Sequence, residues 1–500
     1  MIIQLLWRAP LAVLGGMIAL YIYPTENQWW LAPLVPAVIF LATAGMKFWS
    51  AALVGFLAGQ AFYISHIEWL ALYLGPVPLI ALSTLMSFYF SLGVGVTAWL
   101  YQRAKNRIAS LTSFAFAGTS IWVLREWLGS NFPYGGFPWS RLGMSQADGW
   151  FANYAWWGGI SLVSFAVTLI GYLLAIVVLH FRKFKRNEAF SFAATALAVL
   201  LIPAVTPIGL GTKMVGEIRI AAVQGNANAG LFSNLDRGTI LQNHISATYE
   251  SVEPGEQLDL IVWPENASDL SPLVSAAART EIDRLVETYD APLAFGTITS
   301  RGEEIFNSTI FWEPGVGPTD YYDKKRPVPF AEYVPDRAFW RMLAPDLIDL
   351  VSRGYSFGTR DGIFADDSFT AGTLICFEIA ADDIPRGLAG QGAQVILSQT
   401  NNADFGYSDE TFQQAAIARL RAIETGRAVV NISTVGLSAI YLPNGQVLDE
   451  LEWYTSAAMV QSVPLIDGAT PATSLGSWFD GVNALLAFTF IGLRLRRRKR

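Results

Sequence analysis

Cysteine, histidine and charged residues are all scarce in this chain. Its 500 residues include one cysteine, three histidines and only 15% charged residues, whereas soluble proteins carry about 25%. A single cysteine excludes an intrachain disulfide and a cysteine-rich metal site. The histidines, His66, His180 and His244, lack the spacing of metal ligands. We therefore predict that the protein uses no metal and no cofactor.

Long apolar segments make up much of this weakly charged chain. Hydrophobic residues make up 52% of the chain, and about eight stretches approach the ~20 residues that cross a bilayer. These stretches are 9–24, 29–45, 48–65, 76–100, 112–126, 157–180, 189–209 and 475–493. The short stretch 112–126 also fits an interfacial or re-entrant segment. We predict seven membrane helices in 1–211, a globular domain in 212–474, and a last span with a basic tail in 475–500.

Three groups of basic residues predict the orientation in the membrane. They are Arg103, Lys105 and Arg107, then 182–186, and the final run 494–500. Such residues remain on the cytoplasmic side of membrane proteins. With the N-terminus in the cytoplasm, all three groups lie there, and 212–474 lies on the opposite side. Because the basic runs flank apolar segments, we expect contact with membrane lipids and no nucleic-acid partner.

The region 212–474 alternates strand-like and helix-like segments. Short β-branched runs predict strands at 218–226, 258–265, 291–299, 308–314, 370–378 and 393–401. Helical spacing predicts helices at 275–289 and 410–426, the second capped by Gly426. Asn444-Gly445 predicts the turn of a hairpin. This alternation predicts a layered α/β domain.

Three side chains in this domain are of the types needed for acyl transfer through a thioester. Cys376 ends a predicted strand and supplies a nucleophile. Glu265 follows Trp263-Pro264, whose apolar wall predicts a desolvated carboxyl that acts as a base. Lys324 precedes a proline-rich loop and supplies a cation for an oxyanion. Each residue alone also fits a plain structural role: a buried thiol, a solvated strand end or a charged loop.

Three sequence strings carry a resemblance to a known family. WPEN, YDKKRPVPFAE and LICFE, in this order, resemble the nitrilase superfamily, and WVLREWLGSNFPYGGFPWSRLGMSQADG resembles its membrane-bound branch, the apolipoprotein N-acyltransferase family. The resemblance implies an α-helical bundle of about eight spans and an extracytoplasmic α-β-β-α sandwich in a bacterial inner membrane. It implies that Glu265 is the general base, Lys324 the oxyanion-stabilising cation and Cys376 the nucleophile. The implied supporting residues are Glu332, Phe377 and Glu378.

The same resemblance implies an activity and two partners. A fatty acyl chain would pass from a membrane phospholipid to the α-amino group of an S-diacylglyceryl-cysteine at the N-terminus of a lipoprotein. A membrane-tethered carbon–nitrogen hydrolase with the same triad is one alternative. A transporter or scaffold, whose outer domain only binds, is another. The sequence does not indicate an oligomeric state.

Substrate contacts are expected at five positions: Trp139, Arg141, Trp340, Asp404 and Phe405. Trp139 and Arg141 also fit a plain interfacial anchor. The chain departs from the family pattern at Asp404, where a tryptophan is usual, and at Phe377, where a tyrosine is common. Apolar residues at helical spacing within 334–358 predict a core helix; a lid that dips into the membrane interface is the alternative.

Overall fold

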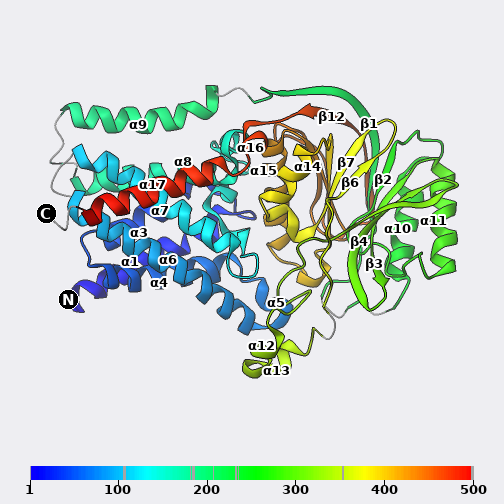
Figure 1. The fold of residues 1–500 in the computed structure, drawn as a ribbon, viewed down its shortest axis with the longest axis horizontal. Helices are drawn as coiled ribbons and strands as arrows, with labels where there is room; N and C mark the ends of the chain where they lie inside the picture. Colours follow the sequence, from blue (N-terminus) through cyan, green and yellow to red (C-terminus); the bar gives the residue numbers. More distant parts are fainter. Residues whose placement is uncertain are drawn as a thin grey trace. The chain divides into compact units, whose positions relative to one another are not determined.

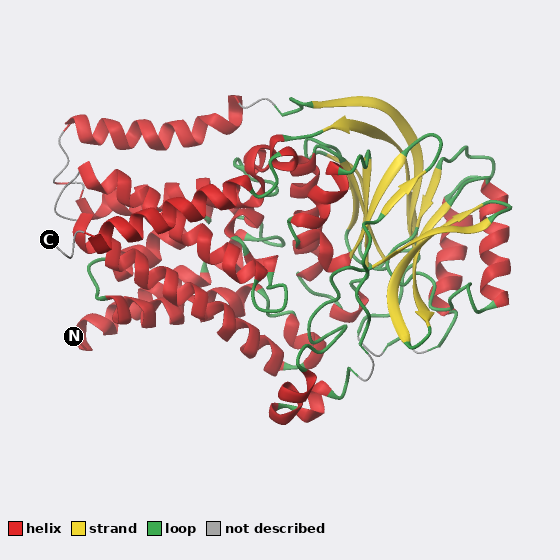
Figure 2. Cartoon of the chain, in the orientation of Figure 1, coloured by secondary structure: helices red, strands yellow, loops and turns green. Residues whose placement is uncertain are grey.

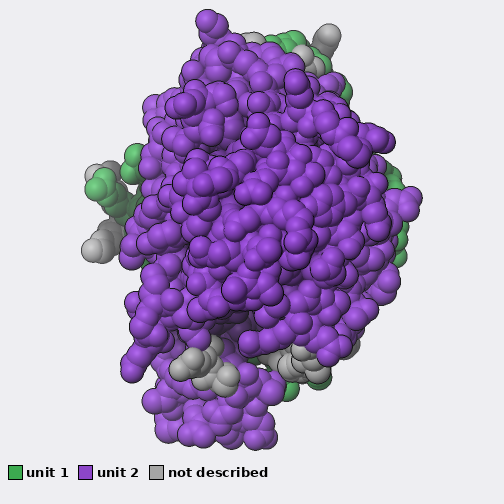
Figure 3. All heavy atoms as spheres, turned by 90° about the vertical axis from the view of Figure 1, so that its right-hand side faces the viewer, with its two compact units in different colours: residues 1–71, 75–208, 477–500 green, residues 72–74, 209–476 purple. Residues whose placement is uncertain are grey.

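The computed structural model describes residues 2–104, 109–180, 182, 186–205, 208–230, 233–234, 236–351 and 354–496. Several of the predicted cytoplasmic residues lie outside these ranges: Lys105, Arg107, Lys183, Lys185 and 497–500. The chain forms two compact units, coloured separately in Figure 3. The helical unit contains residues 1–71, 75–208 and 477–500, and the α/β unit contains residues 72–74 and 209–476.

The helical unit contains one helix for each of the predicted apolar stretches (Figures 1 and 2). These helices are α1 (Ile2–Met17), α3 (Leu34–Thr43), α4 (Phe48–His66), α6 (Pro76–Ala104), α7 (Ala109–Asn131), α8 (Ala155–His180), α9 (Arg186–Val205) and α17 (Trp478–Arg496). Short helix α2 (Ala19–Ile22) also belongs to this unit, and short helix α5 (Leu70–Leu74) follows α4, with residues 72–74 in the α/β unit. Among the described residues, four helices are long and apolar enough to cross a membrane: α4, α6, α17 and the segment 152–180 that includes α8. A total of about eight spans therefore stays a prediction.

Aromatic side chains hold the interior of the helical unit together. Phe40 of α3 packs against Tyr101 of α6, Phe114 of α7 and Tyr172 of α8, with ring centroids 5.0–5.4 Å apart. Large apolar side chains also face outward, as at Phe88, which is 58% exposed. A water-soluble protein rarely exposes so much apolar surface. The helices therefore present the surface expected of a membrane protein.

The α/β unit contains two six-stranded sheets. The first has the order β12-β1-β2-β3-β4-β5 and the second the order β11-β10-β9-β8-β7-β6. The strands of the first sheet are β1 (Thr212–Gln224), β2 (Leu260–Val262), β3 (Leu293–Arg301), β4 (Glu304–Glu313), β5 (Gly317–Asp323) and β12 (Ala457–Gly468). Those of the second are β6 (Ile363–Ala365), β7 (Thr370–Ile375), β8 (Val395–Thr400), β9 (Ala428–Ser433), β10 (Ser438–Tyr441) and β11 (Val447–Leu451). Strands β1, β2 and β3 run parallel, as do β7, β8 and β9.

The two sheets pack face to face, with helices on their outer faces (Figure 1). Side chains alternate along a strand, so Ile220 of β1 lies in the core between the sheets. The next residue, Ala221, lies in the core that includes residues of α10 (Thr239–Ser251) and α11 (Ala276–Tyr289). Helices α14 (Asp383–Gly390) and α15 (Glu410–Thr425) belong to the second sheet's side. The unit is an α-β-β-α sandwich.

The structure confirms the strongest sequence predictions in this unit. Helices α11 and α15 occupy the predicted segments, and Gly426 caps α15 with φ 65°. Strands β10 and β11 form the predicted hairpin, with Gly445 at φ 81°. Strand β5, with the sequence GPTDYYD, was not predicted, because it has no alternation of apolar and polar residues.

Candidate active site

Three strand ends position the three residues of the predicted triad. Glu265 lies three residues beyond the end of β2, and Lys324 directly follows β5. Cys376 directly follows β7 and begins the short 3₁₀ helix η6 (Cys376–Ala380). Two of these strands belong to the first sheet and one to the second. The triad therefore forms only when the two sheets pack against each other.

A buried lysine pairs with two carboxylates at this site. Lys324 Nζ lies 3.3 Å from Glu265 Oε1 and 2.9 Å from Glu332 Oε2. Lys324 is only 1% exposed and Glu265 only 5%. Burial by itself would lower the pKa of Lys324, but Glu265 and Glu332 raise it well above its usual value. The lysine is therefore a permanent cation.

An amide and a backbone N–H orient the two carboxylates. Asn307 Nδ2 donates to Glu265 Oε1 at 2.7 Å and to Glu332 Oε1 at 3.0 Å. The backbone N–H of Val328 donates to Glu332 Oε2 at 2.6 Å. Asn307 lies in β4, whose pairing with β3 and β5 fixes its position. The orientation of Glu265 thus depends on a rigid sheet.

Glu378 joins the cysteine turn to the lysine loop. Its carboxylate accepts hydrogen bonds from the backbone N–H of Ile375, from those of Lys325 and Arg326, and from the Tyr322 hydroxyl, at 2.8–3.0 Å. Glu378 is fully buried. Since its partners directly flank Lys324 on one side and Cys376 on the other, this carboxylate holds the two reactive segments together.

Cys376 has a strained backbone and a half-buried side chain. Its φ is +53°, in the left-handed region that costs a residue with a side chain free energy. Burial raises the pKa of the thiol, and the charge of Glu265 adds to the effect while Lys324 opposes it. Burial likewise raises the pKa of the Glu265 carboxyl, against the opposing charge of Lys324. The thiol is therefore neutral at rest, and Glu265 is a stronger base than an exposed glutamate.

A buried polar network also reaches the sulfur. Gln414 Nε2 donates to Cys376 Sγ at 3.6 Å. Gln414 Oε1 accepts from Thr400 Oγ1 and from Asn402 Nδ2, both at 2.7 Å. Asn402 Nδ2 also donates to Glu410 Oε2 at 2.6 Å. Burial raises the pKa of Glu410 to about 8.

Asp404 and Phe405 lie in the short helix η7 (Ala403–Phe405), directly after Asn402. Burial and the charge of Glu265 raise the pKa of Asp404 to about 6, which places its carboxyl near the triad. Phe405 stacks on Tyr73, with ring centroids 5.3 Å apart. Tyr73 belongs to α5 and, with residues 72–74, to the α/β unit. A segment between α4 and α6 thus supplies an aromatic ring beside this loop.

The prediction of a core helix within 334–358 is wrong. Helix α12 (Arg337–Leu343) contains no buried residue, and α13 (Pro345–Ile348) follows it. Phe339 is 50% exposed and Met342 75%. Trp340 is half-buried against Phe330, with ring centroids 5.3 Å apart. This arrangement leaves apolar side chains at the surface and fits the lid alternative.

Trp139 and Arg141 lie in the helical unit. Trp139 belongs to the short helix η2 (Pro138–Ser140) and packs on Trp69 at 5.8 Å. Arg141 is 2% exposed, and the Tyr23 hydroxyl donates to its backbone oxygen. Trp139 is 3% exposed. Such burial does not fit a simple surface anchor, and contact with a head group stays a prediction.

Sequence reasoning did not find Asn307, Gln414, Glu410 or Tyr73. One signal was available for Asn307, which is a polar residue inside the otherwise apolar strand EIFNSTIFWE. Gln414 and Glu410 lie on a helix rich in polar residues, where nothing local marks them. No group of three or more metal-binding side chains occurs in the described part of the chain.

Two family models match the two parts of the chain. The carbon-nitrogen hydrolase family matches residues 219–467, and the apolipoprotein N-acyltransferase N-terminal domain matches residues 15–173. The α-β-β-α sandwich is therefore a carbon-nitrogen hydrolase domain. A solved structure of an amidase from Nesterenkonia sp. is 19% identical, covers 54% of this chain and 98% of its own, and has a TM-score of 0.38.

Two curated relatives match nearly the whole chain. An apolipoprotein N-acyltransferase of Mycolicibacterium smegmatis is 32% identical over 97% of this chain and 85% of its own. One of Photobacterium profundum is 27% identical over 99% of this chain and 96% of its own. The chain belongs to the apolipoprotein N-acyltransferase family.

Proposed function

We propose that this protein transfers a fatty acyl chain from a membrane phospholipid to the α-amino group of the S-diacylglyceryl-cysteine of a lipoprotein. The acyl chain is carried as a thioester on Cys376. The observation that supports this most directly is the buried Lys324 ion-paired with Glu265 in a chain whose only thiol lies beside them. Those groups supply a nucleophile, a base and a cation in one place.

The first half-reaction forms the thioester. Glu265 takes the thiol proton as the sulfur of Cys376 attacks the ester carbonyl carbon, so the attack needs no free thiolate, whose formation the raised pKa of the thiol disfavours. Lys324 and the backbone N–H of Phe377 stabilise the oxyanion of the tetrahedral intermediate. The carbon–oxygen bond then breaks, the leaving oxygen takes the proton from Glu265, and a lysophospholipid departs.

The second half-reaction forms the amide. The lipoprotein's neutral α-amino group attacks the thioester carbonyl, and Glu265 takes the proton that the nitrogen loses. The carbon–sulfur bond breaks, and the sulfur of Cys376 takes the proton back from Glu265. An amide is more stable than a thioester, so this half-reaction runs downhill. Glu332 and Asn307 keep Glu265 and Lys324 aligned throughout.

The choice of an amine over water requires a site with little water. Burial of the base and the cation supports this condition, since Lys324 and Glu265 are both nearly inaccessible. We place the α/β unit on the extracytoplasmic side of the membrane, with the C-terminus in the cytoplasm. The support for this orientation is the set of basic residues at and just after the end of α6, after α8, and at the end of α17.

The test is a single-turnover experiment with the full-length protein in detergent micelles. A phospholipid labelled in its acyl chain should leave label on Cys376, in a bond that neutral hydroxylamine cleaves, together with one lysophospholipid per thioester. Adding a diacylglyceryl-cysteine peptide should move the label to its α-amino group. Cys376→Ala should take up no label, and Glu265→Gln should form the thioester at least about 100-fold more slowly.

Other results would assign another function. Release of free fatty acid, with turnover of small amides and no product on the peptide, would indicate a hydrolase. Full cellular activity of Cys376→Ala would indicate a transporter or scaffold, because the thiol would then have no chemical role. Either outcome would overturn the proposal.

A further inference from the structure

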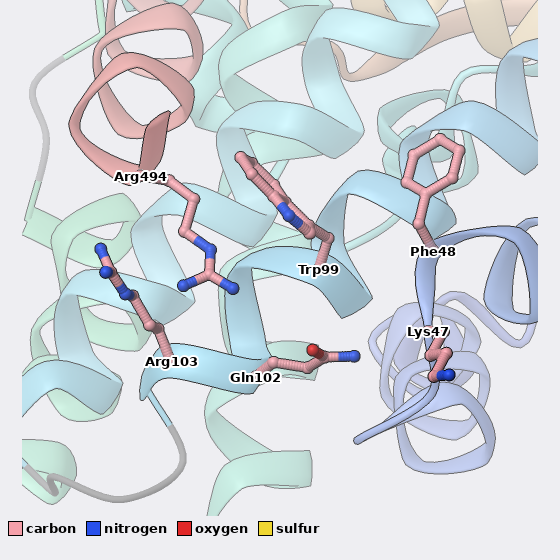
Figure 4. Close-up of a pocket in the computed structure, with 6 residues that line it drawn as sticks. All are labelled: Lys47, Phe48, Trp99, Gln102, Arg103 and Arg494. Carbon is pink, nitrogen blue, oxygen red and sulfur yellow. The ribbon is translucent and has the colours of Figure 1, made fainter. Parts of the chain in front are cut away.

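The helical unit contains a basic pocket that is separate from the triad. It has a volume of about 360 Å³ and is lined by Lys47, Phe48, Trp99, Gln102, Arg103 and Arg494 (Figure 4). We refer to these six residues as the basic pocket. All of them belong to the helical unit, and they come from the start of α4, the last turns of α6 and the last turn of α17. The pocket therefore lies where three helix ends meet.

Contacts within the pocket hold its walls in place. The Arg494 guanidinium lies over the Trp99 ring, 5.0 Å from its centroid. Gln102 Nε2 donates to the backbone oxygen of Met46 at 2.6 Å and so joins the end of α6 to the start of α4. A Cβ atom at Gly95 would lie 3.0 Å from the Phe48 ring, so this glycine allows Phe48 to pack closely on α6. The site is thus partly built before any ligand arrives.

The charge of the pocket selects an anion. Three of its six lining residues are cationic and none is acidic. Helix α4 begins at Phe48, after Lys47, and has no side-chain cap. The first N–H groups of a helix have no acceptor within the helix and carry partial positive charge, which favours a phosphate group. Arginine pairs with phosphate oxygens through two parallel hydrogen bonds.

The aromatic and apolar surroundings indicate a lipid as the source of that anion. Trp99 and Phe48 line the pocket beside the cations. Trp49, next in the chain, is 78% exposed. Tryptophan favours the level of the lipid head groups, and basic pockets between membrane helices bind anionic head groups. Basic residues whose only role is to set the orientation of the protein in the membrane require neither a cavity nor an aromatic ring stacked on them.

We propose that the basic pocket binds the phosphodiester head group of an anionic glycerophospholipid. Arg103, Arg494 and Lys47 neutralise the phosphate, and Trp99 and Phe48 contact the glycerol backbone and the first acyl carbons. None of the triad residues takes part. This lipid is a bound structural or regulatory molecule and is distinct from the acyl donor.

The test measures lipid selectivity of the full-length protein. Native mass spectrometry of the delipidated protein in detergent compares phosphatidylglycerol, phosphatidylcholine and inorganic phosphate. The wild type should bind phosphatidylglycerol at least about 10-fold more tightly than phosphatidylcholine, and millimolar inorganic phosphate should not displace it. Arg103→Gln/Arg494→Gln should lose this preference. The control Arg182→Gln/Arg496→Gln, which removes the same charge at two exposed positions, should keep it.

Each remaining outcome has a definite meaning. Equal selectivity of the pocket variant and the control would overturn the proposal and leave the residues a role in orientation alone. Displacement by inorganic phosphate would show a site for free anions, which also overturns the lipid assignment. If the double variant does not fold, Lys47→Gln and Trp99→Leu, each tested alone, should reduce the preference several-fold.

Discussion

Gln414 of α15 donates a hydrogen bond to the sulfur of Cys376, with 3.6 Å between Nε2 and Sγ. The contacts of the side-chain oxygen determine how the Gln414 amide is oriented. Gln414 Oε1 already accepts from Thr400 and Asn402, so the N–H groups must face the sulfur. A donor at this distance stabilises a thiolate more than a thiol. Gln414 is thus placed to position the nucleophile and lower the cost of its ionisation.

Loss of this donor should raise the pKa of Cys376. Gln414→Leu removes the N–H donor and the acceptor oxygen together. Gln414→Glu puts a carboxylate oxygen in place of the N–H donor and keeps an acceptor for Thr400 and Asn402. A hydrogen bond is worth about 1 kcal/mol, so Gln414→Leu should slow alkylation of Cys376 about fivefold at pH 7. Gln414→Glu should slow it further, because its negative charge also opposes the thiolate. Because Cys376 is the only cysteine, the rate of iodoacetamide labelling against pH reports this thiol alone. Gln446→Leu, at an exposed position of the hairpin, is the control. An unchanged pH profile would limit Gln414 to a structural role.

Removing the charge of Asp404 should shift the acid limb of the activity profile. Glu265 helps raise the pKa of Asp404 to about 6, and the interaction is mutual, so ionised Asp404 must raise the pKa of Glu265. Asp404→Asn removes a negative neighbour and lowers the pKa of Glu265. The base then stays ionised to lower pH, and the acid limb of thioester formation should move down by roughly one unit or less. The exposed Asp367→Asn should leave it unchanged; a shift to higher pH would contradict the electrostatic argument.

Replacing Glu410 should remove a pH-dependent loss of stability. Burial raises the pKa of Glu410 from 4.5 to about 8 in the folded protein. Between these values the folded state holds a proton that the unfolded chain releases, so rising pH favours unfolding. Between about pH 4.5 and 8, the free energy of unfolding of the wild type should therefore fall relative to that of Glu410→Gln. The fall is about 1.4 kcal/mol for each unit by which the folded and unfolded pKa values of Glu410 differ. Thermal unfolding of both proteins in detergent across this pH range measures the difference in their stability. A difference that does not grow with pH would refute a neutral, buried Glu410.

The exposed side chains of α12 should matter for lipid but not for folding. Phe339 and Met342 are 50% and 75% exposed, and surface substitutions usually change stability by less than about 0.5 kcal/mol. If α12 is a lid that enters the interface, Phe339→Ser/Met342→Ser should raise KM for phospholipid in vesicles several-fold and leave the melting temperature unchanged. Val274→Ser, at a position 87% exposed elsewhere in the α/β unit, is the matched control. An unchanged KM would argue against the lid.

Elements with strong local signals are the ones that the sequence predicts correctly. Segments such as 275–289 and 410–426 were predicted because helical periodicity and a capping glycine are properties of neighbouring residues. The polar strand β5 was missed because no local pattern marks it. The core helix predicted within 334–358 was wrong for a related reason. Its apolar residues are spaced as in a buried helix, and the sequence does not say what lies opposite them.

The amino-acid sequence by itself determined the apolar helices, the alternation of strands and helices, and the types of the three reactive groups. Only the tertiary structure decided that Lys324 pairs with both Glu265 and Glu332, that Asn307 aligns those carboxylates, and that Gln414 lies against the sulfur. The reason is physical. Periodicity and capping act over a few residues, whereas the free energy of a buried charge depends on partners from distant strands.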